Sequence, residues 1–79
     1  MPREKTMKVV FALPTTTMAM KMEAAAKAKE APGRLIPVPR QISAGCGMAW
    51  CAPVADRVSL EQLIATEQIV TEGCYELLL

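Results

Sequence analysis

The chain has 79 residues, with nine Lys or Arg, eight Asp or Glu and no His, which leaves a net charge of +1. This length allows one small domain over residues 1–79, ordered from about residue 7, whose core is too small to enclose a deep active-site cavity. A net charge so close to zero provides no strong field for a polyanion, so we expect neither nucleic acid nor a membrane as a partner.

Three cysteines, Cys46, Cys51 and Cys74, limit the possible chemistry. The apolar run Val9–Leu13 is too short for a secretory signal and ends at Pro14, and no run is long enough to cross a membrane. We therefore expect a soluble, cytoplasmic protein with free thiols. One chain without histidine builds neither a zinc site nor a Cys–His catalytic pair, and three thiolates are one short of an iron–sulfur ligand set. We expect no metal and no cofactor.

The first half of the sequence predicts a strand followed by a helix. Lys8–Leu13 is rich in β-branched and aromatic residues, and its alternation places Val9, Phe11 and Leu13 on one face. Threonines then offer N-caps to an Ala- and Met-rich segment of high helix propensity. We expect this helix to end at Ala31, because a Pro-Gly pair follows.

The second half predicts two strands, a helix and a final strand. Residues 34–38, RLIPV, are short and extended, with prolines that suit a sheet edge, and Met48–Ala52 follows as the next strand. Ser59 and Gln62 match a capping box, which predicts that the second helix begins there. A glycine breaks the helical pattern before a last strand over Cys74–Leu79.

This order of elements predicts an α+β fold of the ferredoxin-like βαββαβ type. It would be a four-stranded antiparallel sheet with both helices on one face. The helices would pack through apolar side chains, namely Met22, Ala26, Leu63 and Ile64. The other, uncovered face would carry Val10, Ala12, Cys74 and Leu78. Because so apolar a face is unusual in water, we expect a homodimer or another partner to cover it.

The stretch Pro37–Gly47, PVPRQISAGCG, is the candidate site. Gly45 and Gly47 remove side-chain bulk on both sides of Cys46, which frees the backbone and leaves the sulfur open to approach. Backbone N–H groups of a glycine turn, together with the cation of Arg40, would favour the thiolate, which is the nucleophilic form. The alternative is a small cysteine packed in a tight turn, since free cysteines are often buried.

A structural role is favoured for Cys51 and Cys74, because each lies in a predicted strand beside large apolar residues. A disulfide between Cys46 and Cys51 is also disfavoured. In an extended segment the two Cα atoms would lie about 16 Å apart, far beyond disulfide reach, so only a folded-back loop would allow the bond.

The central stretch resembles a known family of small bacterial and archaeal domains. Residues 34–40, RLIPVPR, are followed by an Ile-Ser pair and then by Cys46 and Gly47. With the preceding strand and helix, this order of motifs is similar to the Se/S carrier protein-like family, from Lys8 to about Tyr75.

The resemblance implies a carrier protein rather than a turnover enzyme. Cys46 would accept sulfur or selenium as a persulfide or selenosulfide and relay it onward. Arg40 would stabilise the thiolate, and Ser43, Gly45 and Gly47 would shape the loop. The partners implied are proteins that donate and accept sulfur or selenium.

The chain departs from the family pattern at Trp50 and Cys51, where the family has an aliphatic residue and then a polar or aliphatic one. Two other functions fit the residues. One is a protein–protein interaction module that docks through its open sheet face or Pro-rich loop, with Cys46 incidental. The other is a redox-sensing subunit that pairs Cys46 with a thiol of another chain. Thiol reactivity against pH distinguishes them.

Overall fold

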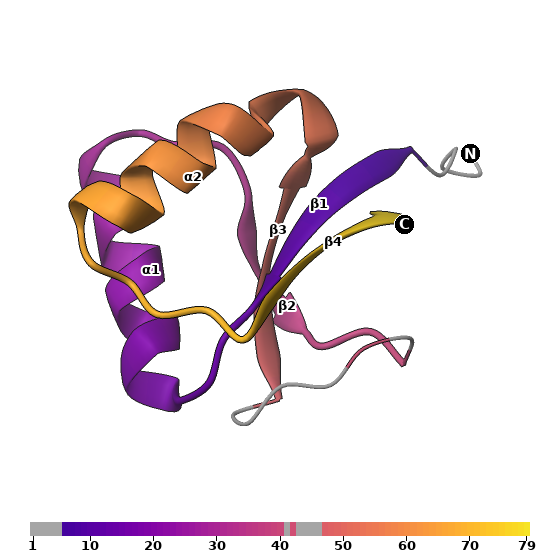
Figure 1. Cartoon of the computed structure of the whole chain (residues 1–79), viewed down its shortest axis with the longest axis horizontal. Coiled ribbons are helices and arrows are strands. Elements are labelled where there is room, and N and C mark those ends of the chain that lie inside the picture. The colour runs from indigo at the N-terminus through magenta and orange to yellow at the C-terminus, as the bar shows by residue number, and fades with distance from the viewer. Residues whose placement is uncertain (1–5, 41, 43–46) are drawn as a thin grey trace.

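The computed structural model describes residues 6–40, 42 and 47–79. In chain order the elements are β1 (Met7–Ala12), α1 (Thr16–Ala28), β2 (Arg34–Pro37), β3 (Met48–Pro53), the 3-10 turn η1 (Val54–Asp56), α2 (Arg57–Thr66) and β4 (Gly73–Leu78). The strands form one sheet in the order β2-β3-β1-β4, with every neighbouring pair antiparallel. Both helices lie on one face of this sheet (Figure 1). The predicted ferredoxin-like α+β fold is confirmed.

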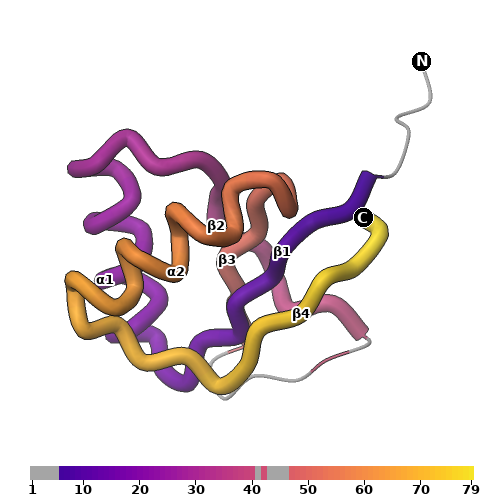
Figure 2. Tube along the Cα trace, turned by 45° about the horizontal axis from the view of Figure 1, so that its top comes forward, coloured from indigo at the N-terminus to yellow at the C-terminus, as the bar shows by residue number. Residues whose placement is uncertain are grey.

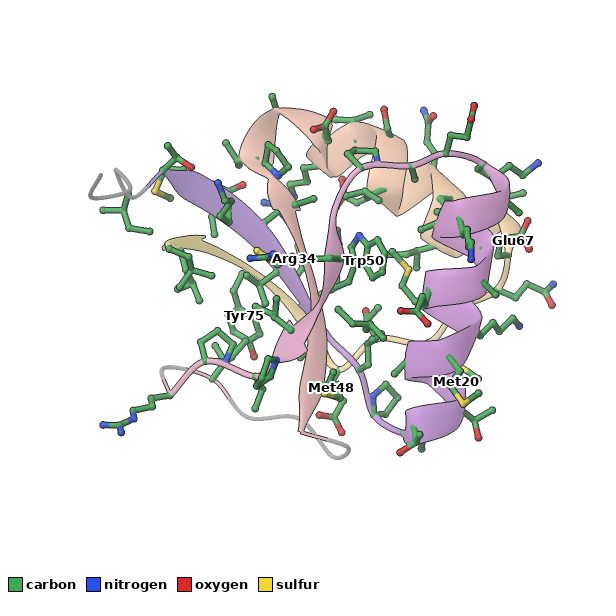
Figure 3. All side chains as sticks on the ribbon, turned by 180° about the vertical axis from the view of Figure 1, so that it is seen from behind. Met20, Arg34, Met48, Trp50, Glu67 and Tyr75 are labelled. Atoms are coloured by element: carbon green, nitrogen blue, oxygen red, sulfur yellow. The ribbon has the colours of Figure 1, made fainter. Side chains whose placement is uncertain are left out.

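The core lies between the sheet and the helices. The alternation in β1 is confirmed, because Val9, Phe11 and Leu13 all belong to the buried cluster under the helices. Trp50 of β3 points to the same side, whereas Arg34 and Tyr75 lie on the other (Figure 3). The predicted helix contacts are also confirmed: the cluster includes Met22, Ala26 and Leu63, with Ile64 packed against it.

Helix α1 begins as predicted but ends earlier. The Thr15 hydroxyl accepts a hydrogen bond from the Met18 N–H at 3.2 Å, which caps the first turn. The helix ends at Ala28 rather than Ala31, because Glu30 adopts a left-handed conformation with φ 53°. The Ala31 N–H then turns back onto the last helical turn, which closes it in the Schellman manner.

The predicted start of α2 is wrong. Ser59 is not an N-cap, because η1 leads directly into α2 and the helix already begins at Arg57. Helix α2 also ends earlier than predicted, well before Gly73, where the helical pattern breaks. Gln68 takes φ 56° two residues after Thr66, and the Ile69 N–H bonds back to the helix, so Ile69 enters the core.

The prediction for the second face of the sheet is partly wrong. In the antiparallel register Val10 lies opposite Tyr75, whereas Phe11 lies opposite Cys74. Directly opposed residues share a face, so Cys74 and Leu78 belong to the helix side and Tyr75 to the other. Strand β4 carries apolar residues on both faces, so its alternation alone did not predict which face lies against the helices.

The second face is also less open than its lack of helices suggests. Val10 and Ala12 have 0% of their surface exposed, although both lie on the side away from the helices. The described part of the β2–β3 connection runs along that side (Figures 1 and 2). Tyr75 lies over Gly73, since a Cβ added at Gly73 would come within 2.7 Å of the tyrosine hydroxyl.

Trp50 ties the connection between α1 and β2 to the sheet. Its indole N–H donates to the Pro32 carbonyl at 3.1 Å, and only 4% of the residue is exposed. Gly33 follows with φ +108°, and a Cβ there would lie 2.5 Å from the indole nitrogen and 2.6 Å from the Cys51 carbonyl oxygen. Both the dihedral angle and the space require glycine at this position.

We expect Gly33→Ala to lower the free energy of unfolding by about 2–4 kcal/mol. Alanine in a left-handed conformation is strained, its Cβ would overpack the site, and the two costs add. Gly47→Ala is the matched control. It has φ +73° but nothing within 4 Å of the added Cβ, so its loss should be about 1 kcal/mol. Urea denaturation measures both losses. Equal losses in the two variants would contradict the packing argument.

Candidate functional site in the connection between β2 and β3

The base of the connection continues the β2–β3 ladder. Pro37 pairs with Met48, and one step further the Val38 N–H donates to the Gly47 carbonyl at 2.9 Å. This bond closes a hairpin at the end of the two strands. The positive φ of Gly47, +73°, then turns the chain into β3.

Just beyond the base, the chain makes a tight turn. The Ile42 N–H donates to the Pro39 carbonyl at 3.1 Å, which is the hydrogen bond of a β-turn. Arg40 is the second residue of this turn and is exposed, so its cation faces water at the end of the hairpin. Proline at the first position leaves that corner without a backbone donor.

Two of the predicted site residues are therefore placed on the same hairpin. Arg40 lies in its turn and Gly47 at its base. The space around Gly47 is open, since an added Cβ would meet nothing within 4 Å. Cys46, Ser43 and Gly45 lie outside the described residues, and their roles stay predictions.

Cys51 is a free thiol on the sheet face away from the helices. It is half-buried and lies between Arg34 of β2 and Val10 of β1 in the cross-strand register. Burial raises the pKa of the Cys51 thiol above its ordinary value, while the nearby charges of Lys8 and Arg34 act in the opposite direction.

Cys74 is a free thiol on the helix side and packs against the core. Burial raises the pKa of the Cys74 thiol above its ordinary value; the Arg57 cation opposes this shift, and Glu61 and Glu76 add to it. Arg57 is itself held by both acids, at 3.4 Å from Glu61 and 2.5 Å from Glu76. Burial therefore lowers the fraction of each of these two thiols that is ionised at neutral pH.

The cations beside Cys51 could not be expected from any local sequence pattern. Arg34 is distant from it in sequence, but the hairpin makes the two residues direct neighbours, as they are equally far from the closing pair of Val38 and Gly47. Residues at equal distances from the closing pair of a hairpin lie opposite each other, so a correctly placed closing pair would have predicted this contact.

Within residues 6–40, 42 and 47–79, no three His, Cys, Asp or Glu side chains gather closely enough to hold a metal ion. No helix in the same ranges combines the length and the apolar character that a membrane span requires.

Comparison with known proteins adds one finding. No curated protein and no solved structure gives a significant match to the chain. A family model does match, over residues 8–76, which include most of β1, both helices, the whole β2–β3 connection and most of β4. Its description is "Putative Se/S carrier protein-like". A match over so much of the chain shows the family, and the protein therefore belongs to this family of Se/S carrier-like proteins.

Proposed function

We propose that the protein carries sulfur or selenium on Cys46, as a persulfide or a selenosulfide. The observation that carries this proposal is the family match over residues 8–76, which spans the complete connection between β2 and β3. The same connection holds the motif of Arg40, Ser43, Cys46 and Gly47 that the resemblance selected.

The hairpin supports this role. It holds the Arg40 cation exposed at one end of the sheet and leaves the space around Gly47 open. A cation and free backbone N–H groups stabilise a thiolate, and the absence of side chains at Gly45 and Gly47 lets a partner approach closely. Burial raises the pKa of the other two thiols, Cys51 and Cys74, which lowers the fraction of each that is present as thiolate.

The proposed chemistry is thiol exchange in two steps. The Cys46 thiolate attacks the outer sulfur of a donor persulfide, so that a bond from Cys46 to that sulfur forms as the donor's S–S bond breaks. The donor thiolate leaves with the electron pair. A nucleophile of the acceptor then attacks the outer sulfur and releases the Cys46 thiolate, which restores the carrier. Selenium follows the same course as a selenosulfide.

Each cycle needs two proteins, a donor and an acceptor, which makes the protein a relay rather than a turnover enzyme. We place it in the cytoplasm, where reducing conditions keep cysteines as thiols, because three is an odd number of cysteines and Cys51 and Cys74 are both free.

The first test is sulfur transfer to the full-length protein from a small persulfide such as cysteine persulfide. We expect the peptide that contains Cys46 to gain the mass of one sulfur atom, because its thiolate is the favoured nucleophile. Cys46→Ser should abolish the gain, whereas the matched variants Cys51→Ser and Cys74→Ser should keep it. Mass spectrometry of the digested protein locates the added sulfur, and circular dichroism confirms the fold.

If sulfur spreads evenly over the three cysteines, or if Cys46 reacts only after denaturation, the carrier proposal is wrong. An interaction module with an incidental cysteine would then be the better account.

The second test concerns Arg40. We expect the alkylation of Cys46 to titrate with a pKa below that of an ordinary thiol. Arg40→Gln should raise this pKa by roughly half a unit, because an exposed charge pair contributes about 0.2–1 kcal/mol. Arg34→Gln removes the same charge from β2 and should leave the titration of Cys46 unchanged. Alkylation rates between pH 6 and 10 (roughly the range in which thiols titrate) measure the effect, and an equal shift in both variants contradicts it.

Self-association through the open sheet face also stays a prediction. Val10 and Ala12 are fully buried, so an apolar contact between copies would depend on Tyr75, which is 37% exposed, and on Leu77. We expect a dimer at micromolar concentration that Leu77→Lys weakens, because the change places a cation in the apolar contact, on a face that already carries Lys8 opposite position 77. Sedimentation velocity measures the association, and a wild-type monomer at all concentrations excludes it.

A further inference from the structure

A thiol and two cations meet in one depression on the sheet face away from the helices. The depression has a volume of about 340 Å³. It is lined by Lys8, Gly33, Arg34, Cys51, Ala52 and Pro53. Three different strands supply the charged and nucleophilic groups, and the sheet register fixes them there: Arg34 pairs with Cys51, while Lys8 pairs with Pro53 two residues further along β3.

The depression is positively charged. None of its lining residues is acidic. Within the described residues both salt bridges involve Arg57, so neither Lys8 nor Arg34 has a carboxylate partner there. The hydrogen bond that the Lys8 ammonium donates within the described residues goes to the Thr6 hydroxyl, which is neutral. An anion that enters the depression would therefore meet two cations beside the Cys51 sulfur.

We propose that Cys51 is a modification site that forms mixed disulfides with small anionic disulfides, the class to which glutathione disulfide belongs. Lys8 and Arg34 would hold the carboxylates of the incoming molecule while one of its sulfurs lies against the thiol. This site is distinct from Cys46 and does not depend on the carrier function.

The exchange balances without a further reagent. The small fraction of Cys51 present as thiolate attacks one sulfur of the disulfide, a bond from Cys51 to that sulfur forms, and the original S–S bond breaks. The other half leaves as a thiolate with the electron pair. Cys51 is thereby oxidised, and the released half is reduced.

Cys74 provides an internal comparison. It is also half-buried, and burial raises the pKa of both thiols. Its surroundings differ in charge, because Glu61 and Glu76 lie near it and both form salt bridges with the nearby cation Arg57. The two cysteines lie on opposite faces of the sheet, and an approaching reagent meets a different charge at each.

The test uses full-length protein with Cys46→Ser and two aromatic disulfides, dithiobis(nitrobenzoate), which carries two carboxylates, and dithiodipyridine, which is neutral. Peptide mass spectrometry gives the rate at each cysteine. We expect the ratio of the Cys51 rate to the Cys74 rate to be about fivefold higher with the anionic reagent. This excess should disappear in concentrated salt, which screens the charges. Glutathione disulfide should likewise modify Cys51 before Cys74.

In the double variant Lys8→Gln, Arg34→Gln, the ratio of the Cys51 rate to the Cys74 rate should be the same with both reagents. Lys21→Gln, on the exposed side of α1, should leave the excess with the anionic reagent unchanged. If the double variant does not fold, the salt dependence of the parent protein decides the question. The proposal is overturned if both reagents give the same ratio in the parent protein, or if Cys51 reacts with neither reagent before denaturation.

Discussion

The hydrogen bond from the Trp50 indole to the Pro32 carbonyl is the contact on which the rest of the sheet edge depends. It fixes where the chain returns from α1, and Gly33 can pass only because it has no side chain to meet the indole. Arg34 begins β2 immediately afterwards, so this contact also sets the register of β2 on β3. The hydrogen bond that closes the hairpin of Arg40 and Gly47 continues the same β2–β3 register.

Much of the fold could be predicted because burial on one side leaves a periodic trace. The alternation in β1 and the apolar stripes of both helices identified the residues of the core correctly. Strand β4 carries apolar residues on both faces, so only its pairing with β1 decided that Cys74 faces the helices. The start of α2 was misplaced because η1 supplies the first turn, which makes the capping pattern at Ser59 coincidental. The helix ends depend on Glu30 and Gln68 in left-handed conformations, which their residue types do not favour.

For the candidate site, the sequence could point to a continuous motif, whose role stays a prediction, but it could not identify neighbours that come from different strands. Arg40 and Gly47 stand close together in the sequence, and the hairpin keeps them on one element. Strand pairing brings Lys8, Arg34 and Cys51 together from three strands, so no local sequence pattern predicts this group. The fold thus places two thiols of similar burial in different electrostatic surroundings, Cys51 beside two cations and Cys74 beside one cation and two acids.

The sheet combines a local pairing with a very distant one, and the two differ in entropic cost. The hairpin of β2 and β3 closes a short loop at Val38 and Gly47, whereas β1 and β4 join residues from opposite ends of the described chain, as far out as the mutual hydrogen bonds of Thr6 and Leu79. Closing the longer loop costs more chain entropy, and non-local pairing of this kind slows folding. Closing the hairpin that bears the candidate site therefore costs less chain entropy than pairing β1 with β4. Complete burial of β1 requires that long-range pairing with β4.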